Sequence, residues 1–167
     1  MLLIGFSVSA ISETIKFEVP DGSALVFSKA DAPYWLSFNG KATISGVYQF
    51  HNDPDSPYGS PIYMYFYPDT ESQNLLPYLK ERGKDEKANE IFVRDGVAAA
   101  KILLDEGAAK KLESGEVRHY SGESTILIEG FSGGYECDSP TFIAKVVEEV
   151  KKIKAAQDAL LKEKDGC

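Results

Sequence analysis

The chain has 167 residues, 43% of them hydrophobic and 26% charged, which predicts one domain with enough apolar surface for a core and excludes general disorder. Its formal net charge of -8 repels phosphate backbones and anionic lipid surfaces, so we expect no nucleic-acid partner. No stretch approaches the run of about 20 apolar residues that a spanning helix needs, so we also expect no stable membrane insertion.

The first residues favour export. They read MLLIGFSVSAISE, with an apolar run over 2–8 and no charged side chain before Glu13, which is typical of the hydrophobic part of a signal peptide. The basic residue that usually precedes such a run is missing, and the alternative is an N-terminal strand. We interpret residues 1–10 as a remnant of a signal peptide, residues 11–167 as a single domain, and the location as periplasmic or secreted.

Two hairpins are predicted next. Residues 13–28 read ETIKFEVPDGSALVFS, in which two alternating apolar runs flank a Pro-Asp-Gly corner. Residues 33–50 repeat this arrangement around the Asn-Gly pair at 39–40, which suits a type I′ turn. A loop rich in proline and acidic residues follows, so we expect the chain to be β up to about residue 67.

The segment IYMYFY, residues 62–67, predicts a strand with an unusual surface. Because side chains alternate along a strand, one face carries aliphatic and phenyl groups and the other carries a ladder of tyrosines: Tyr63, Tyr65 and Tyr67. If exposed, this ladder and Tyr48 could stack on a sugar or on an apolar patch of a partner, since tyrosine combines a large apolar ring with a hydroxyl. If the strand is buried on both faces, the tyrosines would instead pack under a helix with their hydroxyls at its rim.

The middle of the chain predicts helices around a short strand. Asp69-Thr70 can cap a helix over 71–83, with Pro77 as a site for a kink, and the segment EIFVRDG after it predicts a strand. Residues 97–115 carry a helical apolar stripe that Gly107 interrupts. This segment is therefore either helical throughout or a strand followed by a short helix, and we favour helix for its second half.

Residues 130–134 read GFSGG, which spells the G-x-S-x-G of a nucleophile elbow. The motif requires a strand, a sharp turn and a helix, and only the strand is predicted here. Both His51 and His119 precede Ser132, whereas α/β-hydrolases place the histidine after the serine. We therefore interpret 124–138 as one long bent strand or a hairpin and predict no catalytic residue. The alternative is a small serine hydrolase that uses Ser132 with His119 or His51 as base.

The cysteines and histidines predict no cofactor or metal. Cys137 and Cys167 are the candidate pair for one disulfide, which an exported protein could keep, and two separate thiols are the alternative. His51 and His119 could bind a metal together with Asp53 and Asp55, but their spacing matches no known ligand motif.

The C-terminal part predicts a long helix. Ser139-Pro140 is typical of a helix start, and an apolar stripe then recurs at steps of three and four residues: Ile143, Val146, Val150, Ile153, Gln157 and Leu160. The opening TFIAKVV is rich enough in β-branched residues that a strand could come first. The stripe could pack on its own sheet or on a second copy, so the oligomeric state stays open.

Together these elements predict an α+β domain with a mainly antiparallel sheet, arranged as an OB-like small barrel with a long C-terminal helix. The aromatic ladder, the export signal and the missing catalytic set favour a non-catalytic exported binding protein. We expect it to contact a protein or a cell-envelope partner through an aromatic-rich β surface that includes Tyr48, Tyr63, Tyr65 and Tyr67.

Overall fold

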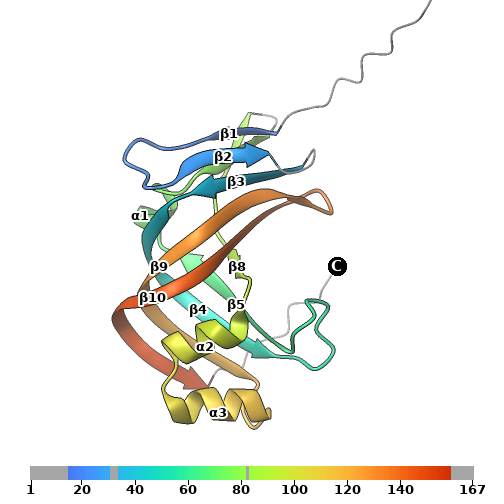
Figure 1. Cartoon of the computed structure of the whole chain (residues 1–167), viewed down its shortest axis with the longest axis vertical. Coiled ribbons are helices and arrows are strands. Elements are labelled where there is room, and N and C mark those ends of the chain that lie inside the picture. Colours follow the sequence, from blue (N-terminus) through green and yellow to red (C-terminus); the bar gives the residue numbers. More distant parts are fainter. Residues whose placement is uncertain (1–14, 31–33, 82, 159–167) are drawn as a thin grey trace, which may run out of the picture.

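The computed structural model describes residues 15–30, 34–81 and 83–158, and this part of the chain is mostly β (Figure 1). Its strands are β1 (Lys16–Glu18), β2 (Val26–Ala30), β3 (Trp35–Asn39), β4 (Lys41–Asn52), β5 (Ile62–Pro68), β6 (Tyr78–Glu81), β7 (Lys84–Glu86), β8 (Ile91–Val93), β9 (His119–Glu136) and β10 (Ser139–Asp158). Its helices are short: α1 (Thr70–Gln73), α2 (Gly96–Leu103) and α3 (Glu106–Ser114).

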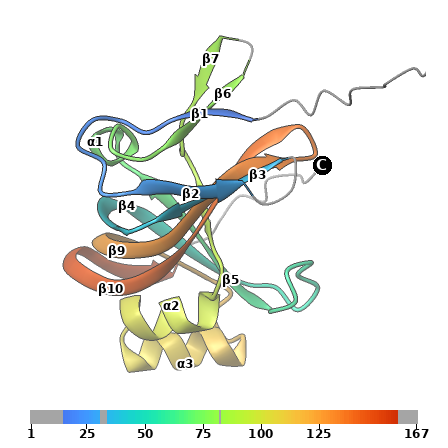
Figure 2. The ribbon, with the colours of Figure 1, turned by 45° about the horizontal axis from the view of Figure 1, so that its top comes forward.

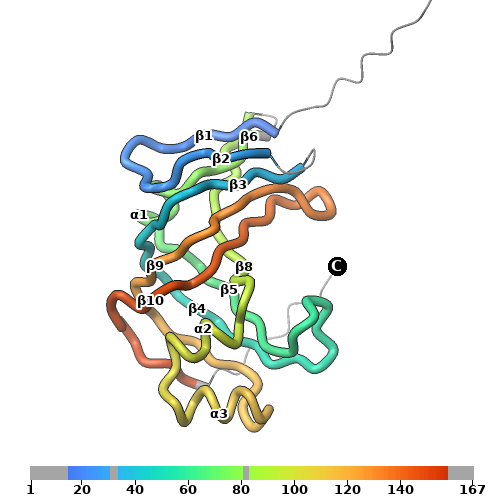
Figure 3. Tube along the Cα trace, in the orientation of Figure 1, coloured from blue at the N-terminus to red at the C-terminus, as the bar shows by residue number. Residues whose placement is uncertain are grey.

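The strands form two sheets. Three strands pair in the order β1-β6-β7, and seven pair in the order β10-β8-β5-β4-β9-β3-β2. Strand β10 also pairs with β9, so β4, β5, β8, β10 and β9 close into a ring, which β3 and β2 extend on one side (Figure 3). Among the described pairings β8–β10 is parallel and the others are antiparallel.

The core lies inside this ring, because apolar side chains alternate along its strands and point to one face. The buried side chains include Ile44, Tyr48, Phe50, Met64, Phe66, Val93, Ile126 and Ile128. Helices α2 and α3 lie together beside the ring, and α2 packs on β5 and β10 (Figure 2). Leu103 and Leu112 from these helices are fully buried and extend the core.

The second sheet joins the first through phenylalanine rings. Phe17 of β1 stacks on Phe27 of β2 with ring centroids 4.7 Å apart, and Phe38 of β3 meets Phe17 edge-on at 5.6 Å. Because such aromatic pairs add stabilisation beyond the area that they bury, this cluster holds the three-stranded sheet against the seven-stranded one.

The expected α+β class, with an OB-like small barrel and a long C-terminal helix, is wrong. The chain forms a three-stranded and a seven-stranded sheet, and the described residues of the expected terminal helix form strand β10 instead. Strand β10 pairs with β9 along nearly its whole length, and these hydrogen bonds with a distant partner override the local helical pattern. Leu160, the last residue of the predicted stripe, lies outside the described residues, as do residues 1–10.

The two predicted hairpins are also wrong, although their strands exist. Strand β1 pairs with β6 in the smaller sheet, whereas β2 pairs with β3. Strands β3 and β4 do not pair with each other, because both pair with β9, and Gly40 lies between them with φ +108°. A hairpin turn of type I′ requires positive φ at both central residues, and the described chain meets this requirement at Cys137 and Asp138, between β9 and β10.

The middle segment follows its local signals more closely. Asp69 caps α1 as predicted, but the helix ends at Gln73 and residues 78–81 form β6 instead of a last turn. Strands β5 and β8 lie where they were predicted. Residues 97–115 are helical in both halves, because Asp95 caps α2 and Asp105 caps α3, each accepting a hydrogen bond from a first-turn amide.

Candidate functional site

The tyrosine ladder lies on the outer face of the ring. Along β5 the residues alternate between buried and partly exposed, and Tyr63, Tyr65 and Tyr67 occupy the partly exposed positions. Tyr48 does not join them: it is fully buried inside the ring, where its side chain lies over Gly122. The prediction for Tyr48 is therefore corrected, because its position in β4 points inward and leaves no surface for a partner.

Neighbouring elements extend the ladder into an aromatic face, made up of Tyr58, Tyr63, Tyr65, Tyr67, Phe92 and His51. Tyr58, on the loop between β4 and β5, is 50% exposed. Its ring lies 4.6 Å from that of Phe92 on β8, and its hydroxyl is 2.9 Å from the Tyr65 hydroxyl. At the other end His51 of β4 stacks on Tyr63, with centroids 4.8 Å apart and planes within 2°. Three strands and a loop thus assemble one continuous surface.

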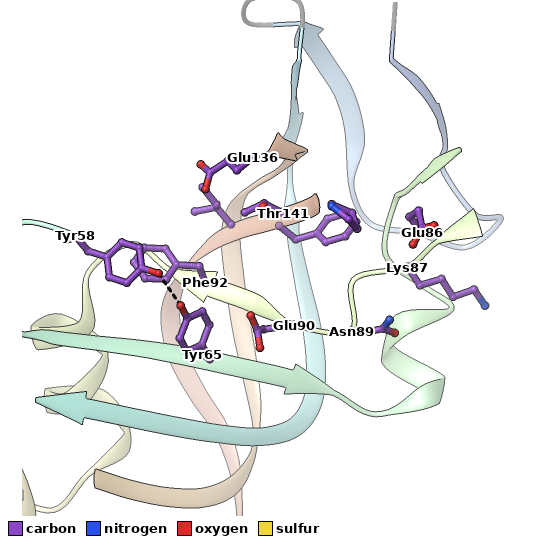
Figure 4. A pocket seen from close by; sticks show the side chains of 12 residues that line it. Tyr58, Tyr65, Glu86, Lys87, Asn89, Glu90, Phe92, Glu136 and Thr141 are labelled. Atoms are coloured by element: carbon purple, nitrogen blue, oxygen red, sulfur yellow. Dashed lines mark hydrogen bonds between the residues drawn. The ribbon is translucent and has the colours of Figure 1, made fainter. Parts of the chain in front are cut away.

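A pocket of about 410 Å³ opens beside this face (Figure 4). Tyr58, Tyr65 and Phe92 form one part of its wall, and Glu136 and Thr141, on either side of the β9–β10 turn, form another. Other lining residues come from the end of β7, from the segment between β7 and β8, and from β10: Glu86, Lys87, Asn89, Glu90, Pro140, Phe142 and Ile143. Its size falls within the usual range for small-ligand sites, roughly 300–1,000 Å³.

The hydroxyls of Tyr65 and Tyr67 stay protonated at physiological pH. Burial, and then the hydrogen bond to Tyr58, raises the pKa of Tyr65 far above its ordinary value. Burial also raises the pKa of Tyr67, with further contributions from the charge of Glu90 and a hydrogen bond to its carboxylate. Neutral phenols can donate hydrogen bonds but cannot act as general bases, so these groups fit binding better than proton transfer.

Ser132 has no base beside it. Its side chain is buried in β9, and the Arg94 guanidinium donates a hydrogen bond of 3.0 Å to its hydroxyl oxygen. A guanidinium holds its proton at any ordinary pH and cannot take one from serine. His119 begins the same strand, a path of about 40 Å along the chain from Ser132 at the usual rise per residue, and His51 pairs with His119. This geometry gives the serine-hydrolase alternative no support.

The glycines of the GFSGG segment have a packing role. A Cβ at Gly134 would lie 1.9 Å from the Trp35 ring and 2.2 Å from the carbonyl oxygen of Tyr34. A Cβ at Gly133 would lie 2.9 Å from the Phe142 ring. The motif is therefore explained by two aromatic rings that lie against the backbone of β9.

The remaining predicted positions carry no chemistry that the structure brings together. Cys137 is an exposed free thiol in the β9–β10 turn, and Cys167 lies outside the described residues. Within residues 15–30, 34–81 and 83–158, no three histidine, cysteine or acidic side chains gather as metal ligands would. Of the helices in this part of the chain, none is long and apolar enough to cross a membrane.

Sequence reasoning found the ladder but missed its neighbours. Nothing near Tyr58 in the sequence indicates that its loop folds back over β5, and a lone Phe92 in a short strand gives no sign of exposure. Known proteins give no further guide, since no family model, no curated protein and no solved structure matches this chain.

Proposed function

We propose that the chain is a non-catalytic exported binding protein that contacts a protein or cell-envelope partner through the aromatic face and its pocket. The observation that carries this proposal is the partly exposed tyrosine ladder, which borders an open pocket of about 410 Å³. Aromatic residues in an accessible hollow supply large contact areas at low cost in conformational entropy, which is why they dominate binding surfaces. Export, in the periplasm or outside the cell, rests on the apolar run at residues 2–8.

The polar groups of the pocket can also form hydrogen bonds with a partner. The neutral hydroxyl of Tyr65 and the carboxylate of Glu90 lie at the same pocket, so apolar contact and hydrogen bonding are available together. Such a combination orients a partner as well as retaining it. Ser132, the candidate nucleophile, is buried, accepts a hydrogen bond from Arg94 and does not line this pocket.

The proposal is tested by affinity capture from the culture fluid and envelope fraction of the source cells. The baits are the wild-type chain, Tyr58→Ala, Tyr65→Ala and the control Ile153→Ala, which truncates an apolar side chain that is 51% exposed on β10, away from the pocket. We expect a partner that the wild type and the control retain and that both tyrosine variants lose by tenfold or more. Equal capture by all four baits would contradict the proposal, provided that circular dichroism shows each variant folded.

The location is tested separately, because a binding surface does not depend on export. A tagged full-length chain is expressed in the source cells, which are then fractionated. We expect the protein in the periplasmic or extracellular fraction and a lower mass after removal of about ten N-terminal residues. Retention in the cytosol at full mass would overturn the location and leave the binding proposal to the capture experiment.

A further inference from the structure

The pocket beside the aromatic face has an acidic lining. Three of its residues are glutamates, Glu86, Glu90 and Glu136, and a single lysine, Lys87, provides the opposing charge. The Lys87 ammonium donates a hydrogen bond of 2.6 Å to the Asn74 side-chain oxygen, which draws it toward α1. In Figure 4 the Glu90 carboxylate lies between Tyr65 and Asn89, and Lys87 extends away from it. The pocket therefore has a net negative charge.

The aromatic wall also favours a positively charged ligand. The rings of Tyr58 and Phe92 lie 4.6 Å apart with planes tilted by 40°, and Tyr65 meets Phe92 at 5.7 Å in an edge arrangement. The faces of aromatic rings carry negative charge density, so they attract a cation placed over them. The ring surfaces that line the pocket therefore add to the attraction of the carboxylates for a cation.

We propose that the pocket binds a lysine or arginine side chain that a protein partner presents. This inference rests on the proposed function and names the chemistry of the partner. A cationic side chain places its methylene groups against the rings and its charge beside the carboxylates, and the pocket of about 410 Å³ has room for it. Arginine fits better than lysine, because its planar guanidinium stacks on rings and pairs with carboxylates through two hydrogen bonds.

Charge complementarity favours a cationic side chain over an anionic or a neutral ligand. The whole chain carries a net charge of -8, which attracts a basic segment from a distance and repels nucleic acid and other polyanions. A neutral sugar could stack on the same rings and donate hydroxyl hydrogen bonds to the carboxylates, but it would gain none of the charge attraction that three glutamates offer a cation. Sugar binding is therefore kept as an outcome of the test.

The test measures the affinity of the full chain for fluorescent hexapeptides by anisotropy. The probes are hexa-arginine, hexalysine and hexacitrulline, which keeps the shape of arginine without its charge, together with a neutral glucan hexasaccharide. We expect arginine to bind most tightly, lysine less tightly, and citrulline at least tenfold more weakly than arginine. Affinity should fall with added salt, as for any contact that pairs charges near the surface.

Matched variants separate the pocket from the general acidity of the chain. Glu90→Gln with Glu136→Gln removes two charges from the pocket, and Glu113→Gln with Glu148→Gln removes two exposed charges elsewhere. We expect the first pair to weaken arginine binding about tenfold and the second less than twofold, because only the first removes a direct partner. Tyr58→Leu should weaken it about fivefold through loss of a ring face.

Equal weakening by the two double variants, or equal affinity for arginine and citrulline, would overturn the inference. The inference would also fall if the glucan binds and its affinity is the same for the wild type and for the variant with Glu90→Gln and Glu136→Gln. If the basic peptides fail but the captured partner is still lost in Tyr58→Ala, the aromatic face binds something else and only the cation assignment falls. If Tyr58→Leu leaves peptide binding unchanged and Tyr58→Ala leaves partner capture unchanged, the proposed function falls as well.

Discussion

The two histidines of the chain meet side by side on neighbouring strands. His51 of β4 lies opposite His119 of β9, with ring centroids 5.2 Å apart, and its other side stacks on Tyr63. Nε2 of His51 and Nδ1 of His119 are buried and have no hydrogen-bond partner among the described residues. Burial, and then the neighbouring His119, lowers the pKa of His51 from 6.5 to about 4, and Asp53 opposes this shift. His51 is therefore neutral at physiological pH.

The buried neutral state of His51 predicts a pH dependence of stability. Its pKa is lower in the folded chain than the ordinary value of 6.5, so the unfolded chain binds more protons between pH 6.5 and about 4. The free energy of unfolding should therefore be fully retained above pH 6.5 and fall as the pH drops toward 4, by at most about 3 kcal/mol from this residue. Urea unfolding at several pH values between 4 and 7 measures this change in the free energy of unfolding.

The matched variant is His51→Phe, which keeps a ring stacked on Tyr63 and removes the titrating group. The difference in unfolding free energy between wild type and variant cancels most of the acid titration that both share. We expect this difference to change by about 1–3 kcal/mol in favour of the variant as the pH falls from 6.5 to 4. A difference that stays constant with pH would show that His51 titrates normally in the folded chain.

At the scale of single elements, β10 is a strand whose sequence pattern predicts a helix. Its pairing with β9 contains repeated register shifts: Val146, Glu149 and Lys152 lie opposite Ile128, Ile126 and Ser124. Three residues of β10 thus match two of β9, because bulges add an extra residue each time. The apolar stripe that predicts a helix does not follow this pairing, because Val150 and Ile153 are each 51% exposed and charged residues lie opposite Ile126 and Ser124. The helical spacing in the sequence therefore does not mark a buried side of β10.

The GFSGG segment of β9 gives the second prediction at this scale. Gly134→Ala should destabilise the chain by about 3 kcal/mol or more, because the new methyl group would overlap the Trp35 ring and the backbone oxygen of Tyr34. Gly130→Ala is the control in the same motif. Nothing lies within 4 Å of a Cβ added at Gly130, and its φ is +61°, so this substitution should cost only about 1 kcal/mol of backbone strain.

Chemical denaturation of the two glycine variants measures these costs. Similar losses at Gly134 and Gly130 would contradict the packing explanation of the motif. The same measurement tests why the GFSGG motif around Ser132 exists. If the glycines are needed for packing, Gly134→Ala lowers the free energy of unfolding, and the motif requires no catalytic role of Ser132 to explain it.

At the scale of the whole molecule, the closed ring positions the site. Strand β8 has three residues and pairs with β5 on one side and β10 on the other, which places Phe92 beside Tyr65. The β4–β5 loop brings Tyr58 onto this strand, and the β9–β10 turn brings Glu136 to the same pocket. The pocket exists because elements between residues 58 and 143 converge on one short strand.

The unequal size of the two sheets predicts unequal local stability. Strands β4 and β9 have ring partners on both sides and carry much of the buried core, whereas β1, β6 and β7 have three or four residues each. We expect amides of β4 and β9 to exchange only through global unfolding, and those of β6 and β7 to exchange through local opening at lower free energy. Native-state hydrogen exchange measures both. Equal protection in the two sheets would mean that they unfold as one unit.

The sequence by itself determined the features that depend on neighbours along the chain. Asp69, Asp95 and Asp105 cap helices because a side-chain oxygen reaches the amides of the next turn. The alternation over 62–67 placed the tyrosines on one face of β5, because successive side chains in a strand point to opposite sides. These interactions span only a few residues, so a single sequence contains both partners.

Only the tertiary structure decided how the strands pair and what lies beside the ladder. Contacts between distant segments decide which strands pair with β1, β3 and β10. They also turn Tyr48 inward and bring Tyr58, Phe92 and Glu136 to one pocket. The same local pattern in β10 suits a helix until the backbone hydrogen bonds of β9 become available. Long-range pairing decides such cases, because propensity differs by less than about 1 kcal/mol per residue and a packed partner strand contributes more.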